Sequence, residues 1–105
     1  MRTGVWGSVL LMLAASVPAL GQEEAALAEE GRRIARQACA DCHGGEGRKP
    51  VLGAPDFAEV APMPSTTATS IRVFLKTPHG TMPDLILSER EVDALAAYIL
   101  SLAGR

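Results

Sequence analysis

Five consecutive residues, Cys39-Ala40-Asp41-Cys42-His43, constrain this chain more than any other feature of its sequence. Their spacing, C-x-x-C-H, is the attachment signature of a covalently bound haem. Two thiols three positions apart on one helical turn can each add across a vinyl group of the porphyrin, and the imidazole that follows can reach the iron. The motif therefore predicts a permanent redox centre, one haem c, held by Cys39 and Cys42 with His43 as an iron ligand.

The same residues allow three other interpretations. A thioredoxin-like pair is expected after a strand in a βαβ pattern, and the sequence shows no such pattern. A zinc site would need two further Cys or His ligands, and His79 is the only other candidate in the chain. A disulfide across so short a loop would contribute little stability, because its loop-entropy term is small. The sequence therefore favours haem attachment over all three.

The first residues resemble an export signal. Arg2 supplies a positive charge, and the segment from Val5 to Leu20 is an almost uninterrupted apolar run. Ala19-Leu20-Gly21 then offers small residues for signal peptidase, and Val17-Pro18-Ala19 is an alternative site. The run is shorter than the ~20 residues that span a bilayer. We therefore expect residues 1–21 to be a signal peptide that is cleaved on export to the periplasm, with an uncleaved membrane anchor as the alternative.

Cleavage after Gly21 would leave residues 22–105, a chain of 84 residues, as a single domain. Loss of Arg2 would change the formal net charge from −2 to −3. A chain this short buries a marginal core and usually needs an additional source of stability, such as a disulfide or a bound metal. Because few aromatic residues are present, the haem is expected to fill much of the core.

Three segments with helical periodicity predict an all-α domain. They are Glu23 to about Asp41, Thr66 to Lys76, and a last helix that begins at the capping box Ser88-Glu89-Arg90-Glu91. Gly31 costs the first helix about 1 kcal/mol relative to alanine. A close crossing by the last helix, with Tyr98 packed against the glycine, would explain it; a merely tolerated glycine is the alternative.

The region after His43 is rich in glycine and proline and predicts an irregular loop, which we expect to continue through residues 58–64. An iron-bound histidine generally donates its other ring N–H to a carbonyl or carboxylate. Pro50 is the candidate for that carbonyl; alternatively, it only makes the loop rigid.

Two basic residues, Arg72 and Lys76, lie four positions apart on the second helix. They are the only charged residues between Met63 and Pro83. The pattern is that of a solvated helix face, and the functional alternatives are contacts with haem propionates or a small basic docking patch.

The second axial ligand of an electron-transfer haem must lie on the face opposite His43. A methionine thioether favours reduced iron and raises the potential. Met82 is the preferred candidate, because a loop six residues before the last helix cap could press it against the iron. Met63, before the second helix, is the alternative methionine, and His79 would give bis-histidine ligation with a lower potential.

Taken together, these motifs resemble a class I (monohaem) cytochrome c over roughly residues 26–102. The specific parts are C-x-x-C-H near the end of the first helix and Met82-Pro83 before the last, with Leu95-Ala96-Ala97-Tyr98-Ile99 within it. The resemblance implies a small all-α cytochrome c-like fold, with three or more helices around one covalent haem and crossed terminal helices. It also implies attachment through Cys39 and Cys42, with His43 and Met82 as ligands. The segment from His43 to Pro50 is short for this family.

The expected function is transfer of single electrons between periplasmic redox proteins through Fe(II)/Fe(III), with no catalytic residues and no nucleic-acid partner. Such a carrier would be a monomer or a partner-bound subunit. The alternative is a haem c subunit of a larger periplasmic oxidoreductase. A haem enzyme or gas sensor is a third possibility, and it would require an open iron site.

Overall fold

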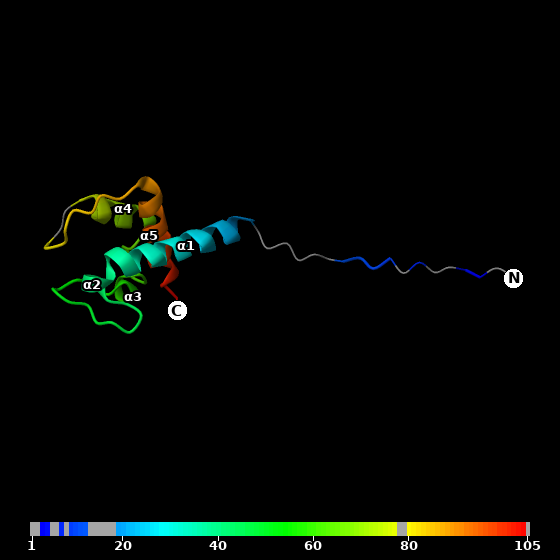
Figure 1. The fold of residues 1–105 in the computed structure, drawn as a ribbon, viewed down its shortest axis with the longest axis horizontal. Coiled ribbons are helices and arrows are strands. Elements are labelled where there is room, and N and C mark those ends of the chain that lie inside the picture. The colour runs from blue at the N-terminus through cyan, green and yellow to red at the C-terminus, as the bar shows by residue number, and fades with distance from the viewer. Residues whose placement is uncertain (1–2, 5–6, 8, 13–18, 78–79, 105) are drawn as a thin grey trace.

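The computed structural model describes residues 3–4, 7, 9–12, 19–77 and 80–104. Over these ranges the fold is all-α, as predicted, and the only β-type pairing is an isolated bridge between Gly45 and Arg48. The helices, drawn in Figure 1, are α1 (Ala19–Ala38), α2 (Ala40–His43), α3 (Phe57–Val60), α4 (Ala68–Lys76) and α5 (Glu89–Ser101).

The first and last long helices, α1 and α5, cross at Gly31. A Cβ atom placed on Gly31 would lie 1.9 Å from the carbonyl oxygen of Ala94 and 2.7 Å from the Cβ of Tyr98. Only a residue without a side chain allows the two backbones to approach so closely. The predicted crossing of the terminal helices at Gly31 and Tyr98 is thus confirmed.

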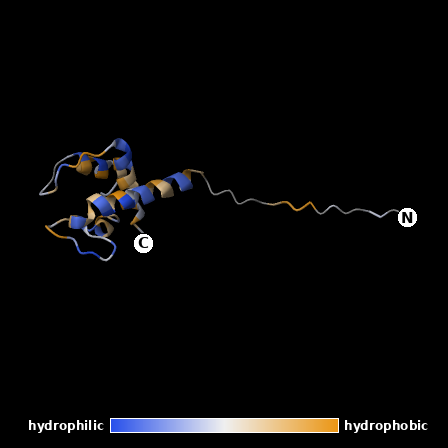
Figure 2. Ribbon diagram, in the orientation of Figure 1, coloured by the Kyte–Doolittle hydropathy of each residue, from blue (hydrophilic) through white to orange (hydrophobic). Residues whose placement is uncertain are grey.

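The core lies on both sides of α5, which is the most buried helix. One group of buried residues joins α5 to α1: Ile34, Ala35, Cys39, Ala94 and Leu95. A second joins α5 to α4 and to the end of α3: Ala61, Ile71, Ala96 and Ile99. In Figure 2 the apolar stretches of the helices alternate with hydrophilic ones, as expected for helices with one buried face.

The boundaries of the first helix differ from the prediction. Helix α1 begins at Ala19, four residues earlier than expected, and its first turn includes part of the predicted signal segment. It ends at Ala38, and Cys39 (φ −116°, ψ −30°) separates it from α2 as the N-cap of that helix. The prediction of one continuous helix through Asp41 was wrong, since the haem motif occupies a short helix of its own.

The prediction of irregular structure over residues 58–64 was also partly wrong, because α3 occupies Phe57–Val60. The side chain of Asp56 caps this helix by accepting a hydrogen bond from the Ala58 amide at 2.9 Å. The two later helices agree with the sequence: α4 begins two residues late behind a Thr67 cap, and α5 has the predicted capping box between Ser88 and Glu91.

None of the helices in the described part of the chain is long and apolar enough to cross a membrane.

Candidate haem-binding site

The two thiols and the imidazole of the motif lie on a single turn around α2. The amides of Cys42 and His43 both donate to the carbonyl of Cys39, at 3.2 and 2.9 Å. Both cysteines are free thiols, Cys42 partly buried and Cys39 only 5% exposed. Burial raises the pKa of the Cys39 thiol to about 11. The turn therefore carries two reduced thiols and one imidazole, with the Cys39 sulfur packed against α5.

The imidazole of His43 is held by two contacts. Its Nδ1 lies 2.8 Å from the carbonyl oxygen of Pro55, and its ring stacks on Phe57 with 4.5 Å between centroids and 27° between planes. Because a carbonyl only accepts, Nδ1 is the donor in this contact, and Nε2 is the ring nitrogen that could reach a metal. The prediction that Pro50 supplies this carbonyl was wrong. Pro50 is exposed and precedes Val51, whose amide donates to the Cys42 carbonyl at 2.8 Å.

The sequence interpretation missed the segment Pro55-Asp56-Phe57, which makes both contacts. Asp56 fixes its geometry, since the cap on α3 sets the direction of the backbone between the Pro55 carbonyl and the Phe57 ring. One signal was available: Asp56 and Glu59 have the spacing of a capping box. That pattern would have predicted α3, although not its contact with His43.

A tight turn follows α2. Gly45 and Arg48 exchange both backbone hydrogen bonds, at 3.1 Å each, and the two central residues, Glu46 and Gly47, have φ of 52° and 87°. Positive φ at both positions indicates a type I′ turn, which is unusual for glutamate. Two ion pairs to α1 hold the Glu46 carboxylate: Arg32 Nε at 2.6 Å and Arg36 Nε at 3.2 Å.

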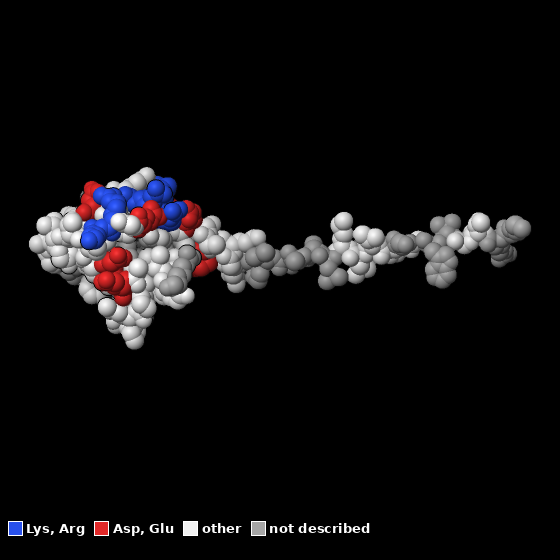
Figure 3. Space-filling model, turned by 90° about the horizontal axis from the view of Figure 1, so that it is seen from below, with Lys and Arg blue, Asp and Glu red and all other residues white. Residues whose placement is uncertain are grey.

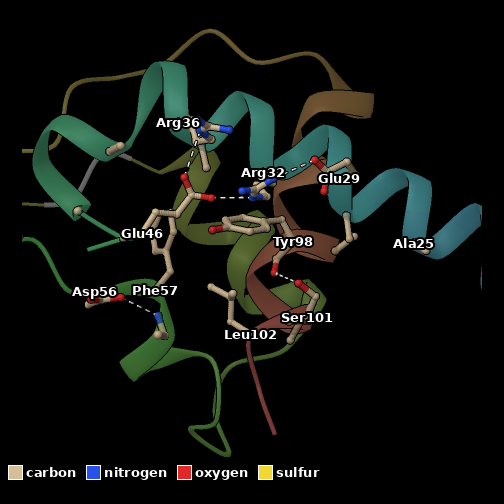
Figure 4. Close-up of a pocket in the computed structure, with 18 of the residues that line it drawn as sticks. Ala25, Glu29, Arg32, Arg36, Glu46, Asp56, Phe57, Tyr98, Ser101 and Leu102 are labelled. Carbon is tan, nitrogen blue, oxygen red and sulfur yellow. Dashed lines mark hydrogen bonds and ion pairs between the residues drawn. The ribbon is translucent and has the colours of Figure 1, made fainter. Parts of the chain in front are cut away.

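Beneath this turn is an open groove of about 1,310 Å³, bounded by α1, α3 and the end of α5. Figure 4 shows the Tyr98 ring across its centre, beside the Arg32–Glu46 pair, with Phe57 on the opposite wall. Burial, followed by the charge of Glu46, raises the pKa of Tyr98. Phe57 thus has the groove on one side and His43 on the other. Ala40 of the motif and the adjacent Gly44 also line the groove, whereas the cysteines, His43 and Met82 do not.

Met82 lies on the segment that joins α4 to α5 and is partly buried. Met63, the alternative methionine, is 50% exposed. His79, the alternative imidazole, lies outside the described residues. In Figure 1 the segment between α4 and α5 and the loop after α2 project from the same end of the molecule.

The basic pair on α4 has partners on α5. Lys76 forms an ion pair with Glu89, and Arg72 forms one with Asp93 and lies 4.0 Å from Glu89. Acidic and basic side chains are intermingled along one edge of the face shown in Figure 3. Arg72 and Lys76 therefore belong to an interhelical ion-pair network rather than to a simple solvated face.

The donor set of the described residues fits a haem better than a bare metal ion. Two free thiols, an imidazole with its Nε2 available and a thioether suit covalent attachment and iron ligation. No group of three or more His, Cys, Asp or Glu side chains that could hold a metal ion occurs among the described residues. Large apolar side chains are also left exposed on the surrounding loops, with Leu52 79% and Ile86 100% exposed.

A helical domain with crossed terminal helices and a C-x-x-C-H turn defines a c-type cytochrome domain. Comparison with known families agrees: the model described as "Cytochrome C oxidase, cbb3-type, subunit III" matches residues 26–99. The chain belongs to this family of cytochromes c, as the resemblance to the class I monohaem proteins predicted. It is therefore an electron-transfer protein, and membership of the family implies covalently bound haem c and redox partners.

Two curated relatives are similar to the chain. Cytochrome c-552 of Bradyrhizobium diazoefficiens is 40% identical over 80 residues, which cover 74% of this chain and 77% of the relative. The cbb3-type cytochrome c oxidase subunit FixP of Sinorhizobium medicae is 32% identical over 82 residues, covering 74% of this chain but only 28% of FixP. No solved structure shows a significant match.

Proposed function

We propose that the chain is a periplasmic monohaem electron carrier. In this proposal Cys39 and Cys42 hold one haem c by thioether bonds, and His43 and Met82 are the axial ligands of its iron. Bound haem supplies the chemistry, a one-electron exchange between Fe(II) and Fe(III). The observation that carries the proposal is the arrangement around His43, where the Pro55 carbonyl and the Phe57 ring fix the imidazole and leave Nε2 available.

Each of these residues has a defined task. The thiols add across the two vinyl groups, so that each sulfur gains a bond to carbon and its hydrogen passes to the neighbouring vinyl carbon. The Pro55 carbonyl increases the electron density of the His43 ring by accepting from Nδ1–H. Met82 would fill the sixth position with a soft ligand, which raises the potential and excludes substrates from the metal. Its partial burial supports it over the more exposed Met63.

The same proposal includes export: residues 1–21 as a signal peptide and 22–105 as the cytochrome c domain. The apolar run and the small residues at 19–21 support it. N-terminal sequencing of the protein purified from the periplasm tests the cleavage site, and retention of residues 1–21 in the membrane fraction would indicate an anchor.

A second function is favoured by the comparisons. The description of the matching family names an oxidase subunit, and FixP contains a segment similar to this chain. The chain would then be the haem c subunit of a larger periplasmic oxidoreductase. Co-purification with a larger redox protein in stoichiometric amount would favour the subunit, whereas isolation of a monomer that exchanges electrons rapidly would favour the free carrier.

Visible absorption spectra of the matured protein test the ligands. The oxidised wild type is expected to show a weak sulfur–iron charge-transfer band near the red end, which Met82→Ala abolishes. Met63→Ala is the matched control and should keep the band. If Met82→Ala leaves the spectrum unchanged, the assignment falls. His79→Ala and Met63→Ala would then identify the ligand, and an open iron site would favour an enzyme or sensor.

A further inference from the structure

The segment that carries Met82 has its two ends tied together. It runs from residue 77 to residue 88, of which 77 and 80–88 are described, between the last residue of α4, Lys76, and the first residue of α5, Glu89. The Lys76 ammonium forms an ion pair with Oε1 of Glu89 across the base of this loop. The loop therefore starts and finishes at a single electrostatic contact.

A second ion pair lies one helical turn further from the loop. Arg72 precedes Lys76 by four residues, and Asp93 follows Glu89 by four, so each pair lies on one face of its helix. Arg72 pairs with Asp93 through Nη2 and Oδ1, and its Nη1 lies 4.0 Å from Glu89. We call these four residues, Arg72, Lys76, Glu89 and Asp93, the α4–α5 ladder.

In the ladder, both positive charges belong to α4 and both negative charges belong to α5. Lys76 lies in the last turn of α4 and Glu89 in the first turn of α5, where each sign is favoured by the helix dipole. Within either helix the two like charges would repel each other at this spacing, so the pairing between helices compensates both. The apolar packing of Ile71 against α5 lies beside the ladder and holds the helices together independently.

We propose that the α4–α5 ladder positions Met82: it closes the base of the ligand loop and holds the thioether at the iron. The proposal rests on Met82 being the axial ligand. A loop tied at its base samples fewer open conformations than one whose ends can separate, so breaking the ladder should release the ligand more readily. Since Ile71 remains packed, the loop opens while the domain stays folded.

The magnitude follows from the exposure of the ladder. Lys76 and Glu89 have side chains 50% and 73% exposed, and a pair this exposed changes an equilibrium constant by at most about fivefold. Reversal of one charge replaces attraction by repulsion and also disturbs the Arg72–Asp93 pair. A total effect of about five- to tenfold on Met82 release is therefore expected.

The test is a titration of the oxidised holoprotein with free imidazole, which competes with Met82 for the iron. Loss of the sulfur–iron band gives an apparent Kd. Lys76→Glu and Glu89→Lys should each lower this Kd by about fivefold. Arg90→Glu is the matched control, because it reverses an adjacent charge whose partner is Glu30 on α1, at 2.9 Å, away from the loop. Its Kd should stay within about twofold of the wild type.

A second measurement needs no ladder variant. The imidazole Kd of the wild type should fall several-fold as the salt concentration rises from about 0.01 M to about 1 M, because salt screens exposed charges. The ladder proposal is overturned if the single reversals match Arg90→Glu, or if salt leaves the Kd unchanged. If the wild type itself lacks the sulfur–iron band, ligation by Met82 fails and the ladder proposal fails with it, a result distinguishable from the others.

Discussion

Replacement of Gly31 by alanine has two opposing effects on the free energy of unfolding. Helix propensity alone would stabilise α1 by about 1 kcal/mol. Packing opposes it, since the added Cβ would lie 1.9 Å from the Ala94 oxygen and 2.5 Å from the Ala94 carbonyl carbon. These are backbone atoms of α5 and cannot turn aside, so the helices must separate by about 1.5 Å to restore an ordinary contact near 3.4 Å.

The expected outcome is a net loss. Overpacking of a core costs about 1–3 kcal/mol, and a clash with backbone lies at the upper end of that range. After the gain in propensity, Gly31→Ala should lower the stability by about 2 kcal/mol. For a domain of this size that corresponds to a fall in Tm of about 8–16 °C.

Thermal unfolding of the holoprotein, followed by circular dichroism at 222 nm, measures the change. Ala25→Gly is the matched control, because Ala25 is an exposed residue of the same helix and the substitution reports the propensity effect alone. It should cost about 1 kcal/mol. A Gly31→Ala protein as stable as the wild type, or more stable, would refute the close crossing of α1 and α5.

Two further predictions concern α5. Leu95 is fully buried, so Leu95→Ala should cost about 2–5 kcal/mol in chemical denaturation; a loss below about 1 kcal/mol would contradict its central place in the core. Hydrogen bonds from the Ser88 backbone and side chain lower the pKa of Glu91 below its ordinary 4.5. This cap therefore contributes stability above pH 4.5 and loses it as the pH falls through the lower, folded-state pKa. Ser88→Ala should raise the Glu91 pKa in an NMR titration and cost about 1 kcal/mol at neutral pH; an unchanged titration would count against the capping box.

The features that the sequence predicted correctly depend on local patterns. The capping box at Ser88 follows from spacing along one helix, and the all-α class follows from apolar periodicity. The crossing at Gly31 is a long-range contact, but a glycine in mid-helix carries an energetic cost that a close approach explains. The family comparison confirms the resemblance that the haem motif and Met82-Pro83 indicated.

The contacts that the sequence did not predict depend on the three-dimensional path of the loops and on how the helices pack. The bond from His43 to Pro55 spans twelve residues and two positive-φ turns, so counting along the loop could not select Pro55 over Pro50. Helix α3 is too short for its periodicity to be visible. The partners of Arg72 and Lys76 lie on another helix, and their pairing depends on how α4 packs against α5.

The burial of Cys39 has a consequence for the order of events in biogenesis. Its neighbours in the core include Ala94 and Leu95 of α5. With α5 packed against it, only 5% of Cys39 is exposed. In the proposed haem protein, the thioether bond at Cys39 would therefore form before α5 packs against α1.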